Sequence, residues 1–265
     1  MRTLLKRSTS GLIYALLFIG AILYSKETYI ILISVFGIVC LWEFLKLLSL
    51  KNIGPYIFFS SLVFLLFSSY KIPMLKQVLL FISLSTSIQL LFYLFLKKKK
   101  YPSSFFEKLD LSIRYTVLSF IFLILIPFEN GEYQKSIVLL MVFLVWTNDS
   151  FAYLIGKNFG EKKLFESVSP KKTVEGFIAG VFFTIIVCVI ASNHFDILST
   201  KQAVIFALIV SIFGSLGDLV ESKFKRQANT KDSGSIMPGH GGLLDRLDSL
   251  MFIAPFVYLY IHYLI

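Results

Sequence analysis

Charged residues are scarce in this chain. They make up 16% of its 265 residues, whereas soluble globular domains contain about a quarter. Hydrophobic residues make up 56%, and the mean hydropathy is +0.77. A soluble all-α domain needs polar helix faces, which the long apolar runs of this sequence lack. We therefore set the soluble class aside and predict an all-α, polytopic integral membrane protein.

Cysteine is also rare. The two cysteines, Cys40 and Cys188, lie inside apolar runs and show no metal-ligand spacing, so the sequence indicates neither a disulfide framework nor a zinc site. Residues 1–25 combine a basic start with an apolar stretch, as a signal peptide does. No cleavage site of the A-x-A type follows, and we therefore expect a retained first helix.

The apolar runs predict about nine transmembrane helices. They cover residues 11–25, 29–48, 55–70, 75–96, 114–128, 136–156, 174–193, 202–220 and 249–264. No soluble domain or clear internal repeat separates them, so we expect a single membrane domain over residues 1–265. Within it, residues 1–128 are expected to form a scaffold of lipid-facing helices. Residues 136–265 are expected to supply the catalytic helices and the cytosolic loops.

Basic residues predict the orientation. The chain has 26 Lys and Arg and a net charge of +10. Most of these residues fall on one side when the N-terminus is placed in the cytoplasm, as the positive-inside rule expects. We therefore predict the N-terminus inside, the C-terminus outside, and no nucleic-acid partner. Loops 157–173 and 221–248 then face the cytosol, where nucleotides and metal ions are available.

Two aspartates lie within or at the end of apolar runs. Asp149 follows Asn148 in W-T-N-D-S, and Asp218 ends G-S-L-G-D. An ionised aspartate in the bilayer costs at least a few kcal/mol unless it meets a cation or water. For either residue alone, a hydrogen bond between helices is an equally good interpretation. Two of them beside basic loops favour a polar cavity that opens inward.

Two further aspartates precede the last apolar run. Asp245 and Asp248 are three residues apart, so they share one helix face if the last helix begins near Leu243. Aspartate at a helix start also suits the helix dipole, and capping alone is the alternative interpretation.

Capping does not explain the glycines and cations around these aspartates. Gly239, Gly241 and Gly242 allow backbone amides to approach an anion closely. The same segment mixes cations with carboxylates: Lys223, Lys225, Arg226, Lys231 and Arg246 with Asp232, Asp245 and Asp248. A lipid-surface patch would be purely basic, so this mixture favours a site for a metal ion and a polyphosphate. His240 lies in the loop, and we assign it no acid/base role.

Residues 156–176 contain a third polar element. Ser169-Pro170 or Thr173 is expected to cap the helix that follows, with Glu175 in its first turn. Lys171 and Lys172 at this helix start form an anion-binding corner, because helix N-termini favour phosphate. The pattern G-x-x-x-x-G-K-[ST] is absent, which excludes a P-loop protein.

These motifs together resemble a known family. The segment S-K-F-K-R-x4-K-D-S-G-S-I-M-P-G-H-G-G-L-L-D-R-L-D, residues 222–248, closely resembles the signature of the phosphatidate cytidylyltransferases, also called CDP-diacylglycerol synthases. Met237 is a conservative departure, because that family has Leu, Ile or Phe there. D-S-x-A-Y-x-x-G (149–156) and S-P-K-K-T-x-E-G (169–176) are also similar. The resemblance covers the second half of the chain.

The resemblance implies an integral membrane enzyme of phospholipid biosynthesis. It implies that CTP and phosphatidic acid react in the presence of Mg²⁺ to give CDP-diacylglycerol and pyrophosphate. A phosphate monoester has its second pKa near 6, so phosphatidate is a nucleophile at neutral pH and needs no strong base. The barrier is the approach of two polyanions, which metal ions and basic side chains lower.

The resemblance also implies a set of roles. The metal ligands are expected among Asp218, Asp245, Asp248 and Asp149, and Asp232 is an alternative for any of them. The phosphates are expected to bind Lys171, Lys172, Lys225, Arg226, Lys231 and Arg246. Ser222, Gly239, His240, Gly241 and Gly242 complete the expected substrate site. Lipid tails are expected to enter from the bilayer and CTP from the cytosol. A second cation beside Mg²⁺ and a homodimer are left open.

Two other functions also require aspartates inside a membrane protein. A Mg²⁺-dependent membrane phosphotransferase acting on a lipid carrier also needs aspartates, but the D-G-x-x-A-R pattern of one such branch is absent. An ion-coupled transporter is disfavoured because no inverted repeat is visible. The short chain without an organelle-type presequence favours a multi-pass protein of a bacterial cytoplasmic membrane, with its active site facing the cytoplasm.

Overall fold

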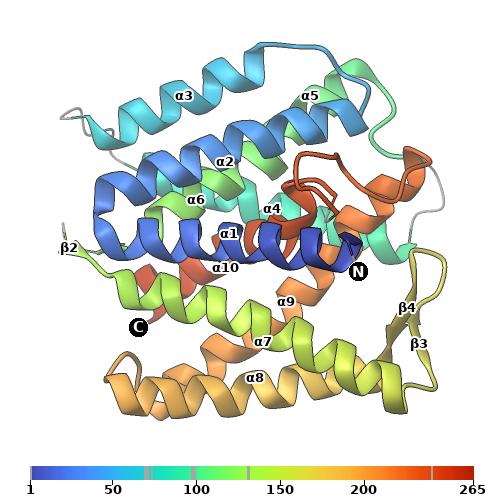
Figure 1. Ribbon diagram of the computed structural model, residues 1–265. Coiled ribbons are helices and arrows are strands. Elements are labelled where there is room, and N and C mark those ends of the chain that lie inside the picture. The colour runs from blue at the N-terminus through green and yellow to red at the C-terminus, as the bar shows by residue number, and fades with distance from the viewer. Residues whose placement is uncertain (1, 69–71, 73, 97–99, 130–131, 240) are drawn as a thin grey trace.

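The computed structural model of the chain is almost entirely helical (Figure 1). It describes all residues except 1, 69–71, 73, 97–99, 130–131 and 240, and only the backbone of residues 2–8 and 96. The elements are α1 (Arg2–Tyr24), α2 (Lys26–Leu47), α3 (Gly54–Phe67), α4 (Leu75–Leu96), α5 (Phe105–Leu111), η1 (Ser112–Val117), α6 (Leu118–Leu125), β1 (Phe128–Glu129), β2 (Glu132–Tyr133), α7 (Lys135–Phe159), β3 (Lys163–Phe165), β4 (Ser169–Thr173), α8 (Val174–Phe195), α9 (Thr200–Gln227), α10 (Leu244–Leu259) and η2 (Tyr260–Leu264).

Six helical segments among the described residues are long and apolar enough to cross a bilayer. They are α2, α4, α7, α8, α9, and α10 continued by η2. The apolar helices Thr9–Tyr24 and Gly54–Phe67 are shorter. A polytopic, mainly helical membrane protein is therefore the architecture, as the sequence predicts. The count of nine crossings and the orientation stay predictions.

One boundary predicted from hydropathy is wrong. Residues 221–227 were expected in a loop, yet α9 continues through them to Gln227. The apolar run ends at the first charged residues, but the helix does not. Glu221 and Lys225 are four residues apart and form an ion pair, which supports the extra helical turns. The other predicted cytosolic loop holds the antiparallel β3–β4 hairpin, which pairs Lys163 with Thr173.

Local signals explain how the helices begin. The Ser25 hydroxyl accepts a hydrogen bond from Thr28 N at the start of α2, and Ser104 and Glu107 form a capping box at α5. Thr173 Oγ1 accepts from Gly176 N at 3.2 Å, so Thr173 is the predicted cap of α8. These caps supply acceptors for amides that lack a partner within the helix.

Small residues bring α7 and α8 into close contact. A Cβ atom added to Gly180 would lie 2.7 Å from Asn148 Oδ1, and one added to Gly156 would lie 2.8 Å from Thr173 Oγ1. Glycines at such positions let helix backbones approach closely within a membrane. The α7–α8 pair thus holds Asp149, which follows Asn148, close to the β3–β4 hairpin.

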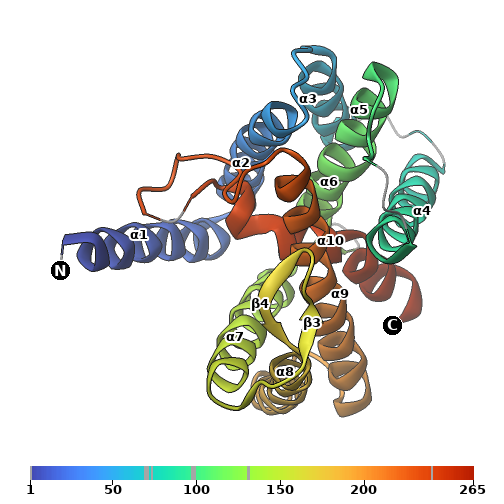
Figure 2. The same ribbon diagram turned by 90° about the vertical axis from the view of Figure 1, so that its right-hand side faces the viewer.

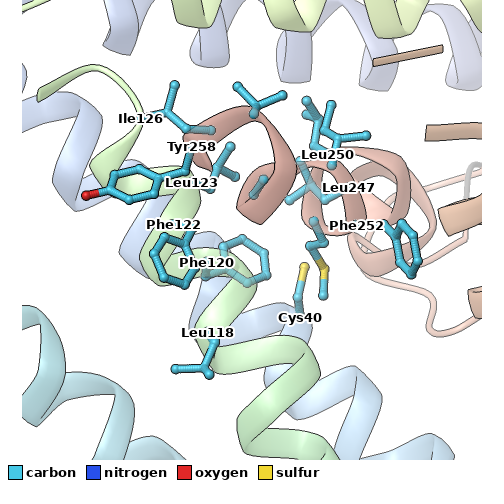
Figure 3. Packing of buried hydrophobic residues seen from close by; sticks show 14 of the residues in the cluster. Cys40, Leu118, Phe120, Phe122, Leu123, Ile126, Leu247, Leu250, Phe252 and Tyr258 are labelled. Atoms are coloured by element: carbon cyan, nitrogen blue, oxygen red, sulfur yellow. The ribbon is translucent and has the colours of Figure 1, made fainter. Parts of the chain in front are cut away.

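The buried core surrounds α10. Figure 3 shows Tyr258 of α10 close to Phe122 of α6, with their ring centroids 4.9 Å apart, and Leu247 and Leu250 of α10 lie in the same buried cluster. Cys40 of α2 lies in the same cluster. Both cysteines are free and buried, and the sequence predicts no disulfide framework. Of the six long apolar segments among the described residues, α10 with η2 is the most buried.

Figure 2 views most of the helices from one end, whereas α1 is seen along its length and extends away from the bundle. There α9 and α10 lie centrally, with α7, α8 and the β3–β4 hairpin on one side and α2, α3, α5 and α6 on the other. The start of α1, the hairpin and the 228–243 loop lie at one end of the bundle, and the C-terminus lies at the other (Figure 1). The polar segments of the second half thus meet at one end.

Candidate active site

Three carboxylates from two helices meet beneath this polar end. Asp218 and Glu221 of α9 and Asp248 of α10 each offer one oxygen, and these atoms all lie within 4.8 Å of one another. Glu221 and Asp248 are buried, and Asp218 is partly exposed. Carboxylates this close repel one another unless a cation lies between them or beside them. We call Asp218, Glu221 and Asp248 the carboxylate cluster.

Lys225 is the buried cation beside the cluster. It follows Glu221 by one helical turn and forms an ion pair with it, and its Nζ lies 2.7 Å from Asp245 Oδ1. The Ser222 hydroxyl donates to Asp218 Oδ1 at 3.1 Å on the same helix. One face of α9 therefore presents acid, hydroxyl and amine groups at successive turns.

Lys172 of β4 approaches the cluster from the hairpin. Its Nζ lies 2.5 Å from Asp218 Oδ2. Burial by itself lowers the pKa of Lys172, but the carboxylates of Asp218 and then Asp149 raise it above the ordinary lysine value. Lys172 is therefore charged at neutral pH. Its neighbour Lys171 is exposed, because successive strand residues face opposite sides.

Asp245 has a different environment from Asp248. Its carboxylate accepts from Gly242 N at 2.8 Å and from Ser233 N at 2.9 Å, in addition to its pair with Lys225. These bonds tie the first turn of α10 to the loop before it, as the glutamate of a capping box does. Asp245 lies outside the three-carboxylate group, as does Asp149, which is exposed on α7.

The remaining predicted residues surround this centre. Arg226 is exposed and donates to Val168 O at 3.3 Å and to Thr230 O at 3.0 Å. Arg246 is exposed and close enough to Asp149 to interact electrostatically. Lys231 and Asp232 are both exposed in the loop.

Two glycines of the loop have left-handed backbones. Gly239 has φ of 80° and Gly241 has φ of 90°, conformations that glycine adopts without strain. Gly242 uses its amide to bind Asp245. His240 lies outside the described residues. The predicted contacts of these glycines with substrate stay predictions.

The side chains of the segment S-K-F-K-R, residues 222–226, point in different directions. Lys223 donates to the carbonyls of Tyr93 and Leu94 at the end of α4, at 2.5 and 3.1 Å. Phe224 packs among the rings of Phe44, Tyr93 and Tyr115. Because adjacent helical residues point about 100° apart, only part of this segment faces the cluster.

A cavity of about 570 Å³ lies next to the loop. Its lining includes Lys46, Lys100, Lys108 and Asp232 but none of the three clustered carboxylates. Its size is within the range of ligand pockets. The carboxylate oxygens that could hold a metal ion lie in the cluster rather than in this cavity.

Comparison with known proteins places the chain in a family. Residues 5–264 match the Cytidylyltransferase family. The chain belongs to that family. It is 34% identical over 258 residues to a phosphatidate cytidylyltransferase of Bacillus subtilis (strain 168), which covers 96% of each chain. It is 32% identical over 253 residues to one of Staphylococcus aureus (strain COL), covering 94% of this chain and 95% of the relative.

Sequence reasoning missed two carboxylates of this cytidylyltransferase-family chain. Glu221 was overlooked because it was assigned to a loop, although its spacing of three residues from Asp218 places both on one helical face. Glu43 was overlooked in α2, where it is fully buried. The rule that an ionisable residue inside an apolar span indicates a functional site could have found it.

The charges at the site leave room for a divalent cation. Four carboxyl groups, those of Asp218, Glu221, Asp245 and Asp248, lie beside only two lysines that form ion pairs with them, Lys172 and Lys225. Among the described residues, Glu221 Oε1 has no hydrogen-bond partner although it is buried. Oxygen ligands of this kind suit Mg²⁺, so the residues fit the metal that the sequence predicts.

Proposed function

We propose that the chain transfers the cytidylyl group of CTP to phosphatidic acid at the carboxylate cluster, forming CDP-diacylglycerol and pyrophosphate. The observation that supports this most directly is the placement of three carboxylates against Lys172 and Lys225 in a chain of the cytidylyltransferase family. The names of its curated relatives support the same substrates.

Asp218, Glu221 and Asp248 would hold Mg²⁺. When bound, this ion supplies positive charge between two polyanionic substrates and beside the leaving pyrophosphate. Asp149 of α7 lies close enough to Asp218 for their charges to interact, and it would be a further ligand. This assignment adds Glu221 to the predicted ligands and gives Asp245 the task of holding the loop.

The basic residues bind and orient the phosphates. Lys172 and Lys225 each contact the cluster, and Arg246 is exposed beside it. An oxygen of the phosphatidate monoester attacks the α-phosphorus of CTP, a new P–O bond forms, and the bond to the β-phosphate bridging oxygen breaks. The electron pair leaves with pyrophosphate, whose charge the lysines stabilise. No strong general base is needed, because the monoester is already ionised.

The protein would lie in a bacterial cytoplasmic membrane with this site facing the cytoplasm. The hairpin and the 228–243 loop lie at one end of the bundle (Figure 1). The hairpin contains Lys163, Lys171 and Lys172, and the loop contains Lys231 and follows the basic last turns of α9. The positive-inside rule places such an end in the cytosol. Apolar side chains exposed along α8, such as Ile178, Phe182 and Ile190, would face lipid, from which phosphatidate enters.

The test is pyrophosphate release by detergent-purified protein with CTP and phosphatidic acid, with Mg²⁺ and then with EDTA. We expect release to need both substrates and the metal. Asp248→Asn should abolish it, and the matched control Asp110→Asn, at an exposed ion pair with Arg114, should not. Release from CTP without phosphatidic acid, or equal activity of the two variants, would contradict the proposal.

A further inference from the structure

Glu43 is a carboxylate in the half of the chain that contains no recognisable motif. It lies one turn before the end of α2, which is otherwise apolar in this region apart from Lys46, and its exposed fraction is 0%. Burying a carboxylate is unfavourable unless hydrogen bonds compensate it. Its partners therefore indicate what it does.

Those partners belong to the loop and helix that contain the predicted signature. Glu43 Oε2 accepts from Leu244 N, in the first turn of α10, at 2.7 Å. The same oxygen accepts from Ser233 Oγ at 3.2 Å. Asp245 binds the backbone amide of Ser233, so two carboxylates hold this one residue from different sides. Ser233 is buried, with 4% of its surface exposed.

Two glycines make room for the Glu43 side chain. A Cβ atom added to Gly242 would lie 2.6 and 2.7 Å from the two carboxylate oxygens, closer than real Cβ contacts. A Cβ atom added to Gly234 would overlap Glu43 Oε1. Part of the glycine content of the loop is thus explained by the approach of a carboxylate from α2, rather than by the approach of a substrate.

Leu244 is one helical turn before Asp248, so the amide that Glu43 binds is linked to the position of a cluster residue. We propose that Glu43 is a positioning residue, which holds the first turn of α10 so that Asp248 meets Asp218 and Glu221. The inference rests on the proposed function, because it concerns the same metal-dependent reaction. It assigns the N-terminal half a part in building the active site.

The test compares Glu43→Leu with Glu43→Gln in the full-length protein. Leucine removes the acceptor, whereas glutamine keeps an oxygen for Leu244 N and removes only the charge. Because a shift of about 1 Å in a catalytic group can lower activity by about 100-fold, we expect a loss approaching that size in Glu43→Leu. We also expect it to need more Mg²⁺ for half-maximal activity. Glu43→Gln should lie between Glu43→Leu and wild type on both measures.

Leu90→Ala is the control for loss of stability alone. Leu90 is fully buried on α4 and its apolar side chain forms no hydrogen bond with Glu43 or Ser233, so its truncation leaves a cavity in the apolar core. This variant should melt at a lower temperature and keep the Mg²⁺ dependence of the wild type. Ser233→Ala removes only the hydroxyl bound to Glu43 and should shift the Mg²⁺ dependence in the same direction as Glu43→Leu, to a smaller degree. Ser233→Ala also tests the proposal if Glu43→Leu does not fold.

Two results would overturn the inference. One is a folded Glu43→Leu, or Ser233→Ala, with wild-type turnover and Mg²⁺ dependence, which would reduce the contact to a structural one. The other is an equal loss in Glu43→Gln and Glu43→Leu, which would show that the charge acts rather than the hydrogen bonds. Failure of the proposed function is distinguishable, because the wild-type protein would then release no pyrophosphate.

Discussion

Lys225→Met tests how the carboxylate cluster is held together. Lys225 is 7% exposed and lies between Glu221 and Asp245. Methionine fills a similar volume but leaves both carboxylates without their cation. Removing one partner of a buried ion pair costs about 3–5 kcal/mol. The total stability of a protein domain is about 5–15 kcal/mol, so this loss is a large fraction of it.

The assay combines thermal unfolding in detergent with pyrophosphate release at a temperature where the variant is folded. We expect Lys225→Met to melt well below the wild type and to be inactive even when folded. Glu221→Gln added to Lys225→Met should recover part of the stability, because it removes one of the two unpaired charges. It should not recover activity, because the cluster then lacks a charged ligand.

Lys223→Met is the matched control, two residues away on the same helix. Lys223 binds the last turn of α4 and not the cluster. Its replacement should lower stability and leave the activity of the folded protein near that of the wild type. A Lys225→Met protein that has the melting temperature of the wild type and remains active would refute the electrostatic reasoning.

Two further predictions concern the hairpin and the α7–α8 contact. Because the pKa of Lys172 is raised in the folded state, its pair with Asp218 stabilises the protein fully below the unfolded lysine pKa of about 10.4 and loses this contribution as the pH rises through the folded pKa. The difference in melting temperature between wild type and Lys172→Met should therefore be constant from pH 7 to about pH 10 and shrink above it; a difference that fades near neutral pH would contradict this. Gly180→Ala should lower both stability and activity, because its Cβ would lie 2.7 Å from Asn148 Oδ1 and 3.0 Å from Asn148 O. Gly20→Ala, with nothing within 4 Å of the added atom, should lower neither stability nor activity. An equal gain in stability in the two variants would contradict the prediction and show that helix propensity alone is responsible.

Hydropathy predicted the helical class well, but not where helices end. A charge marks the end of an apolar run, whereas a helix ends where its hydrogen bonds and side-chain contacts end. Residues 221–227 remain helical because Lys223 binds α4, Phe224 packs among aromatic rings, and Lys225 pairs with Asp245 of α10. These contacts join residues far apart in the chain, so no local pattern could reveal them.

The sequence alone determined the membrane class, the family and the supply of aspartates and lysines in the second half. Each depends on composition or on the order of residues. Only the tertiary structure decided which acids meet: Asp218 and Asp248 converge with Glu221, whereas Asp245 turns to the loop amides. It also decided that Glu43 of α2 lies under this loop. The physical reason is that a carboxylate's role depends on its nearest partners, and here those partners come from other helices.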